Sequence, residues 1–308
     1  MRLSSYPKYF TLLITSTLIF TQGCNVFGRS VDANPNPDPT AIQPTFVIPV
    51  LPNQSVSTET PQPTLTVPTL LPDYGLVWQA RFETGDISEV LLHGDFIRQG
   101  ISASYNLVSP HAHTGKYSVG LTIDTTAPSE TGAQSAYLFF WDYSLVPDIA
   151  YYYSAWYYIP SSIKPAKFWN IWQFLSKDID GEGIPRFNIY IVPGDDGLDL
   201  ELHQRTNPEN SDERIKYKQD IIHIPQDKWF QIESYYKKAQ DLSGQVVVWL
   251  DGVEIFNIVG VQTVYSSNQV FWAVNNYSDH IEPNPCTIYI DDMFISKKRI
   301  GPVSLPLP

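Results

Sequence analysis

Short segments in which apolar and polar residues alternate run through most of the chain, and this pattern limits its fold more than any other feature. The clearest example is residues 198–205, where leucines occupy every second position. The leucines are Leu198, Leu200 and Leu202, and they alternate with Asp199, Glu201, His203 and Arg205. Successive side chains of a strand point to opposite faces, so this segment predicts a strand with one buried face and one polar face.

Similar segments follow one another along the chain, separated by turn signals such as Asp251-Gly252, a dipeptide favoured in two-residue hairpin loops. Strands are predicted at 76–82, 117–125, 135–141, 150–159, 168–175, 186–192, 229–237, 245–250, 253–258, 268–275 and 287–296. Helical periodicity with capping residues is almost absent. The pattern predicts an all-β fold, which would be an antiparallel β-sandwich or a barrel.

The N-terminus has the features of a secretory signal. Arg2 and Lys8 precede an apolar run at 9–20, which is too short for a membrane span and is followed by Gly23 and Cys24. The Gly-Cys ending resembles a bacterial lipoprotein signal, which implies that residues 1–23 are removed and that Cys24 is lipidated. Plain secretion is the alternative, because Thr21 stands where this signal usually has leucine.

Residues 24–73 are rich in Pro, Thr, Ser and Asn and lack sustained periodicity. Such a segment cannot bury enough apolar surface to offset its ordering entropy, so it predicts a disordered tether. The β-domain is expected at 74–302, followed by a tail at 303–308. We expect the domain to be extracytoplasmic, lipid-anchored to the cell membrane or cell surface.

Charge and cysteine content exclude some classes of protein. The formal net charge of −12 argues against a nucleic-acid partner, which would require a basic surface. An anionic glycan is not excluded, because its binding depends on the local field. The two cysteines are too few for a disulfide framework, and Cys286 is expected to be a small buried hydrophobe.

The polar row of residues 198–205 lies beside strands crowded with Trp and Tyr, which suits a polysaccharide groove. His203 is the best candidate for a general base, because Glu201 and Arg205 share its face and a carboxylate can orient an imidazole. A plain solvated strand face is the alternative interpretation.

Neighbouring strands offer candidate substrate contacts. Gln173, Asn188 and Tyr190 could hydrogen-bond sugar hydroxyls, and Arg186 could pair with a uronate carboxylate. Trp172 could stack on a sugar ring, although aromatic residues of a sandwich more often pack in the core. Tyr277 lies in a polar segment at 275–280 that is expected to be a loop, with either a functional or a plain turn role.

Several motifs together resemble the concanavalin A-like lectin/glucanase jelly roll, and within it the polysaccharide-lyase-like proteins related to heparin lyase I. The motifs are Phe82-Glu83-Thr84-Gly85-Asp86, His113-Thr114-Gly115-Lys116-Tyr117-Ser118, Trp156-Tyr157-Tyr158-Ile159-Pro160, Phe168-Trp169-Asn170-Ile171-Trp172-Gln173-Phe174, Gly244-Gln245-Val246-Val247-Val248-Trp249-Leu250-Asp251-Gly252 and Ile288-Tyr289-Ile290-Asp291-Asp292. The resemblance covers most of residues 74–300. It implies two antiparallel sheets and, in such lyases, a Tyr or His that moves protons while Arg, Asn or Gln neutralises a uronate carboxylate.

The sequence departs from these lyases at two places. The Arg-x-Glu-Leu strand that many of them carry is replaced by Ala133-Gln134-Ser135-Ala136-Tyr137-Leu138, and the usual Gln-x-His reads Gln173-Phe174-Leu175. The resemblance also implies that Glu83, Asp86 and Asp291 or Asp292 could hold a structural Ca²⁺, as where some jelly rolls join their termini. Residues 178–183 begin like a calcium loop, but Ile189 stands where its bidentate Glu should be, so a turn is expected there.

These observations predict a surface-anchored protein that acts on polysaccharide, with β-elimination on a uronate-containing glycan as the first hypothesis. A non-catalytic carbohydrate-binding module of the same fold is the second. A glycoside hydrolase is a weaker third, because the Glu-x-Asp-x-x-Glu strand of the related glucanases is missing.

Overall fold

The structure is a computed structural model that describes residues 73–303, except 130–131, 142–143, 166–167, 178–182, 210–212 and 267–268 and the side chain of Gln99. The predicted signal peptide, the lipidation site Cys24, the tether and the tail lie outside the described residues, apart from 73 and 303. Most of the calcium-like segment at 178–183 also lies outside them.

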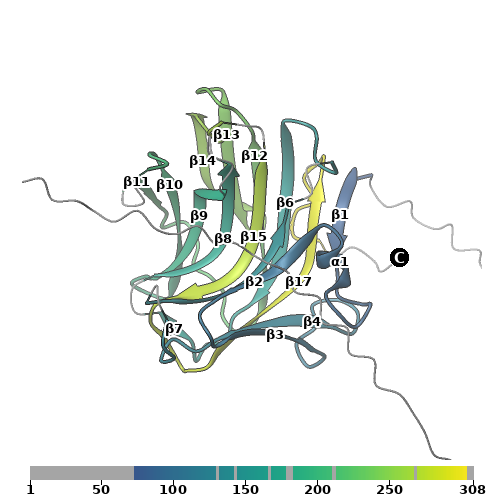
Figure 1. The fold of residues 1–308 in the computed structure, drawn as a ribbon, viewed down its shortest axis with the longest axis vertical. Coiled ribbons are helices and arrows are strands. Elements are labelled where there is room, and N and C mark those ends of the chain that lie inside the picture. The colour runs from purple at the N-terminus through teal and green to yellow at the C-terminus, as the bar shows by residue number, and fades with distance from the viewer. Residues whose placement is uncertain are drawn as a thin grey trace, which may run out of the picture. The chain divides into compact units, whose positions relative to one another are not determined.

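Two antiparallel sheets form the domain, as the alternating pattern predicted (Figure 1). In the described part of the chain, the eight-stranded sheet has the order β14-β13-β12-β6-β17-β4-β3, with β1 paired to β17. Its strands are β1 (Leu76–Ala80), β3 (Ala103–Val108), β4 (Ser118–Ile123), β6 (Ala150–Tyr158), β12 (Trp229–Lys237), β13 (Gly244–Leu250), β14 (Val253–Val261) and β17 (Cys286–Ser296).

The seven-stranded sheet has the order β11-β10-β9-β8-β15-β5-β2. Its strands are β2 (Gly94–Gln99), β5 (Gln134–Phe140), β8 (Trp169–Lys177), β9 (Gly183–Pro193), β10 (Leu198–Arg205), β11 (Arg214–Lys218) and β15 (Val270–Ser278). A short pair, β7 (Lys164–Pro165) and β16 (Ile281–Glu282), and one helical turn, α1 (Ser88–Leu91), complete the described elements. No helix in this part of the chain is both long and apolar enough to span a membrane.

The core lies between the two sheets. Tyr153 of β6 packs edge-on against Phe174 of β8, with ring centroids 5.0 Å apart. The Tyr157 hydroxyl of β6 donates a hydrogen bond of 2.8 Å to the carbonyl of Ile171 on β8, so a polar contact also joins the layers. Cys286 is buried, as predicted, and burial raises the pKa of its thiol to about 12.

Most strands match the predicted ranges within a few residues, and the Asp251-Gly252 turn joins β13 to β14 with positive φ at both positions. Alternation in the segment 168–175 predicts Asn170, Trp172 and Phe174 on one face and Trp169, Ile171 and Gln173 on the other, and this prediction is partly wrong. The pairing register between β8 and β9 shifts between Asn170 and Trp172, so the side chains on either side of this bulge change phase. Trp169, Trp172 and Phe174 therefore all lie in the core.

Candidate active site

The outer face of the seven-stranded sheet carries a row of polar side chains. The leucines of β10 point into the core, so Glu201 and His203 point outward, as predicted. The strand register then places Asn188 of β9 opposite His203, and Gln173 of β8 opposite Asn188. Three neighbouring strands thus bring Gln173, Asn188 and His203 into one line.

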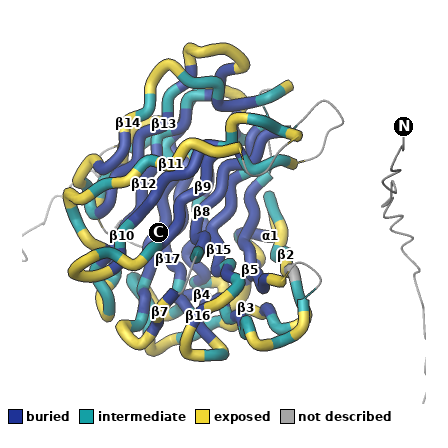
Figure 2. The backbone as a smooth tube through the Cα atoms, turned by 90° about the vertical axis from the view of Figure 1, so that its left-hand side faces the viewer, coloured by how far each residue is buried: buried dark blue, intermediate teal, exposed yellow. Residues whose placement is uncertain are grey.

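These outward side chains are nevertheless largely shielded from solvent. Gln173, Asn188, Tyr190, Glu201 and His203 are each at most 9% exposed. Figure 2 shows that β8, β9, β15 and β5 are mostly buried and that the segments connecting the strands are exposed. A ligand that contacts this face would therefore meet polar groups that are already held in place.

A carboxylate orients the imidazole of His203. Its Nε2 lies 2.9 Å from Oε2 of Glu201, and the other oxygen of Glu201 lies 3.2 Å from Nζ of Lys218. Burial raises the pKa of Glu201, but the hydrogen bonds from His203 and Lys218 outweigh it and hold this pKa below its usual value. Glu201 is therefore ionised near neutral pH and can only accept, so Nε2 of His203 carries the proton.

The other ring nitrogen of His203 is then an acceptor. Its Nδ1 is buried and has no hydrogen-bond partner among the described residues. Burial lowers the pKa of His203, although its hydrogen bond to Glu201 opposes this effect. The imidazole is therefore neutral near pH 7, and its unpaired Nδ1 can take up a proton.

Tyr190 supplies a phenol beside this imidazole. The rings of Tyr190 and His203 lie 4.2 Å apart, and Asn188 Nδ2 donates to the Tyr190 hydroxyl over 3.4 Å. Burial raises the pKa of Tyr190, while the positive charge of Arg214 acts against this rise. The phenol keeps its proton near neutral pH and can donate it. The Oδ1 of Asn188 is buried and has no hydrogen-bond partner in the described part of the chain.

An amide cluster adjoins this pair. Gln173 Nε2 and Asn275 Nδ2 each donate to Oδ1 of Asn170, both over 2.7 Å. Gln173 is also close enough to Tyr137 for a hydrogen bond that partly offsets the rise in the pKa of this phenol, which burial causes. Tyr277 belongs to β15 and not to a loop, which corrects the prediction. Its ring lies 5.9 Å from that of Tyr137.

The other flank of the same face is apolar and aromatic. A second hydrophobic cluster, separate from the core, covers β5, β8 and β15 there. Its members are Tyr137, Phe139, Leu175 and Ala273, with Ile97, Trp141, Phe271 and Tyr277 packed against them. Alternation in the segment 135–141 predicts Tyr137, Phe139 and Trp141 on one face, and all three belong to this outward cluster.

Three predicted substrate contacts are not placed for that role. Arg186 is 2% exposed, and its guanidinium donates to the backbone carbonyls of Gln262 and Arg205, so it cannot pair with a sugar carboxylate. Arg205 donates to the carbonyls of Asn207 and Pro208 and so holds its own loop. Trp172 lies in the core, 5.0 Å from the ring of Trp272, so it cannot be a stacking platform.

The sequence prediction missed the basic residues of β11. Arg214, Lys216 and Lys218 lie opposite Arg205, His203 and Glu201, respectively. The segment alternates as Arg214-Ile215-Lys216-Tyr217-Lys218, a period-two signal that could have predicted the strand.

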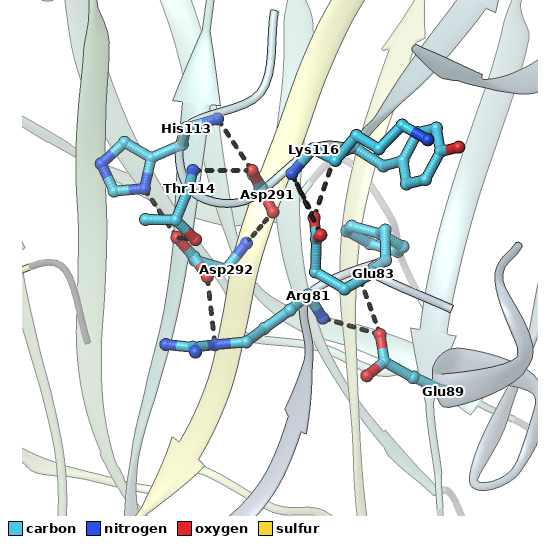
Figure 3. A network of polar contacts seen from close by, with 10 residues as sticks. Arg81, Glu83, Glu89, His113, Thr114, Lys116, Asp291 and Asp292 are labelled. Carbon is cyan, nitrogen blue, oxygen red and sulfur yellow. Dashed lines mark hydrogen bonds and ion pairs between the residues drawn. The ribbon is translucent and has the colours of Figure 1, made fainter. Parts of the chain in front are cut away.

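The carboxylates expected to hold Ca²⁺ bond to separate partners, and Figure 3 shows those of Glu83 and Asp292. Glu83 accepts the backbone N–H groups of Lys116 and Tyr117. Asp86 accepts the N–H of Ser88. Asp292 accepts the Thr114 hydroxyl over 2.8 Å, lies 2.7 Å from Nδ1 of His113 and pairs with Arg81.

Among the described residues, no three His, Cys, Asp or Glu side chains converge as a metal site would require. A calcium site at Glu83, Asp86 and Asp292 therefore stays a prediction, and the arrangement of these side chains does not support it. The network instead fastens the segment around His113 to β17, and Arg81 supplies the positive charge beside Asp292.

A family model described as polysaccharide lyase matches residues 82–294. The endo-β-1,4-glucuronan lyase from the fungus Trichoderma reesei has a similar fold, with 14% identity, a TM-score of 0.50 and coverage of 66% of this chain and 95% of that chain. The PL-14 alginate lyase from Aplysia kurodai gives 13% identity, a TM-score of 0.49 and coverage of 71% and 98%. No curated protein sequence matches the chain.

Proposed function

The chain belongs to the polysaccharide lyase family, and on this premise we propose that it cleaves a uronate-containing polysaccharide by β-elimination at the His203–Tyr190 pair. The observation that carries the proposal is the Nδ1 of His203, which is buried and has no hydrogen-bond partner among the described residues. The ring of His203 packs against that of Tyr190, and His203 lies opposite Asn188 on the neighbouring strand. A neutral base and a protonated phenol side by side are the two groups that such an elimination needs.

The proposed steps use these side chains in turn. Nδ1 of His203 takes the proton from C5 of the uronate, and the electrons of that C–H bond form the C4–C5 double bond. The C4–O bond breaks, and the hydroxyl of Tyr190 gives its proton to the leaving glycosidic oxygen. Gln173 and Asn188 hydrogen-bond the uronate carboxyl group, whose charge must be spread as C5 loses its proton. Glu201 stabilises the imidazolium that forms.

A test compares single variants on alginate, glucuronan, heparin and pectin, with the ultraviolet absorbance of the unsaturated product as the readout. His203→Ala and Tyr190→Phe should lower kcat by about 10²- to 10⁴-fold on the polymer that the wild type cleaves. His111→Ala is the matched control, because its ring packs against Tyr158 and Tyr289 on the other sheet. Full activity of folded His203→Ala would rule out the proposed base.

A non-catalytic carbohydrate-binding module is the second candidate. The aromatic flank of Tyr137, Phe139 and Trp141 favours it, because such rings can stack on sugars without any chemical step. It is also favoured by Arg186, whose guanidinium binds backbone carbonyls and so cannot neutralise a substrate carboxylate. Retained binding with no product from any of the four polymers would select this candidate.

We also propose that the protein is lipid-anchored through Cys24 at the cell membrane or cell surface, which suits a polymeric substrate outside the cell. The support is the sequence alone, namely the apolar run at 9–20 followed by Gly23-Cys24. Cys24→Ser should release the protein from membranes if the anchor is a lipid, whereas an unchanged membrane fraction would exclude lipidation at Cys24.

A further inference from the structure

The edge strand β11 has two different faces. Arg214, Lys216 and Lys218 alternate with Ile215 and Tyr217. The hydroxyl of Tyr217 donates to Oε1 of Gln204 over 2.8 Å, and its ring packs against the core, which fixes this residue on the inner side. The three cations therefore point to the outer face, where His203 and Glu201 lie.

Each cation acts on a side chain of the proposed site. Lys218 reaches Glu201 over 3.2 Å while remaining 76% exposed. Arg214 is close enough to Tyr190 to hydrogen-bond it, and its charge opposes the rise in the pKa of this phenol that burial causes. Lys216 lies opposite His203, and its charge helps to lower the pKa of this imidazole. The strand thus forms one wall of the site as well as the edge of the sheet.

The charge of this wall contrasts with its surroundings. The whole chain carries a formal net charge of −12, yet β11 presents three positive charges within five residues, and Glu201 offsets one of them. The opposite flank of the same face is the aromatic and apolar cluster around Tyr137 and Phe139. The face is therefore cationic at one end and apolar at the other.

We propose that Arg214, Lys216 and Lys218 form a carboxylate-binding strip that holds uronate residues on one side of the cleaved bond. The proposal rests on the proposed function and adds the residues that select an anionic chain. Side chains at alternate positions of a strand are about 6.6 Å apart, so the three cations lie close enough together to act on the carboxylate of a uronate that reaches this edge of the sheet. On the other side of the cleaved bond, the sugar rings lie on the aromatic flank.

Edge strands often carry lysine for another reason, which is to prevent pairing with the edge of another sheet. That role requires exposed charges but no contact with Tyr190 or Glu201. It predicts that loss of the charges promotes association of the protein and leaves polymer binding unchanged. The two roles therefore give different results in a binding measurement on monomeric protein.

The experiment measures retardation of the full-length protein in native gels that contain polyglucuronate. The double variant Lys216→Gln/Lys218→Gln should bind roughly five- to tenfold more weakly than the wild type, with a smaller dependence on salt. Lys216→Gln alone should weaken binding about two- to threefold, and Lys216→Arg should restore it, since the charge is retained. Lys228→Gln is the control, because Lys228 is exposed in the turn before β12 of the other sheet.

Two further polymers identify the recognised group. A carboxyl-reduced polyglucuronate offers no carboxylate to the strip. The double variant and the wild type should therefore migrate alike in gels that contain it. A sulfated glucan that is bound as tightly, and weakened equally in the double variant, would show that the strip binds polyanions in general and would overturn the carboxylate assignment.

The outcomes separate this proposal from the proposed function. If the wild type forms product and the double variant binds like Lys228→Gln, the strip is refuted and the lyase function stands. If the wild type forms no product but the charge variants still lose binding, the lyase function fails and the strip stands. A wild type that binds no polyuronate overturns the strip.

Discussion

Replacing Asp291 with asparagine should remove a pH dependence from the stability of the fold. The carboxyl group of Asp291 is fully buried in β17, at the start of a shift in the pairing register with β6, and it accepts the N–H groups of His113 and Asp292 over 2.8 and 2.7 Å (Figure 3). Burial and, secondly, the charge of Asp292 raise its pKa from 3.8 to about 8. Asp292 in turn faces Arg81 and His113.

The direction and size of this pH dependence are set by the difference in bound protons between the folded protein and the unfolded chain. Between about pH 4 and pH 8 the folded protein keeps the proton of Asp291, while the unfolded chain releases it. The stability that this proton provides is complete below the unfolded pKa and is lost as the pH rises to the folded pKa. The slope from this single group is at most about 1.4 kcal/mol per pH unit, so a few kcal/mol are at stake between about pH 5 and pH 8.

The variant Asp291→Asn cannot ionise, but its NH2 group cannot accept one of the N–H groups that the two carboxyl oxygens of Asp291 accept. It should therefore lose a constant amount of stability at every pH, while its free energy of unfolding lacks the fall of a few kcal/mol that the wild type shows between about pH 5 and pH 8. Urea denaturation followed by tryptophan fluorescence at a series of pH values measures this difference. Asp220→Asn, at an exposed position, controls for the general effect of removing one acid. Parallel curves for the wild type and Asp291→Asn would refute the reasoning.

Three further predictions concern the site and its supports. Glu201→Gln removes the group that raises the pKa of His203, so the acid limb of kcat/KM should move to lower pH; an unmoved limb would exclude His203 as the base. Trp172→Ala should lower the free energy of unfolding by about 3–5 kcal/mol in urea and leave the KM of the remaining folded protein unchanged, whereas a selective rise in KM would place Trp172 at the substrate. Because Glu83 and Asp292 have other partners, a chelator should leave the melting temperature unchanged, and a clear drop would restore the calcium hypothesis.

The fold was largely predictable because period-two alternation is set by the strand itself. The segment 198–205 shows this well, since its leucines had to face the core once the sheet formed. The strand β11 was missed although it alternates, because it is short and carries only Ile215 and Tyr217 as apolar residues. Alternation predicted the wrong face for Trp172, because it assumes an unbroken register and β8 contains a bulge between Asn170 and Trp172.

The site was predictable only in part, because contacts between strands decide which side chains face it and which are held by other partners. Glu201 and His203 share a strand, so their pairing could be inferred from spacing. Arg186 could not be judged in this way, since its guanidinium is captured by the carbonyl of Gln262, 76 residues further along the chain. The neighbours of Asp292 come from the residue that follows β1 and from the segment around His113, and no local pattern indicates that Arg81 would be one of them.

Three tryptophans meet where the two sheets stack. Trp78 comes from β1 of one sheet, and Trp172 and Trp272 come from β8 and β15 of the other. Their ring centroids lie 6.1 Å apart for Trp78 and Trp272 and 5.0 Å apart for Trp172 and Trp272. Indoles at such distances share their electronic excitation, which gives strong near-ultraviolet circular dichroism that is lost when specific packing is lost. Because Trp78 and Trp272 belong to different sheets, the near-ultraviolet circular dichroism of the protein should report whether the two sheets remain packed together. This signal needs no added label and is independent of the strand content.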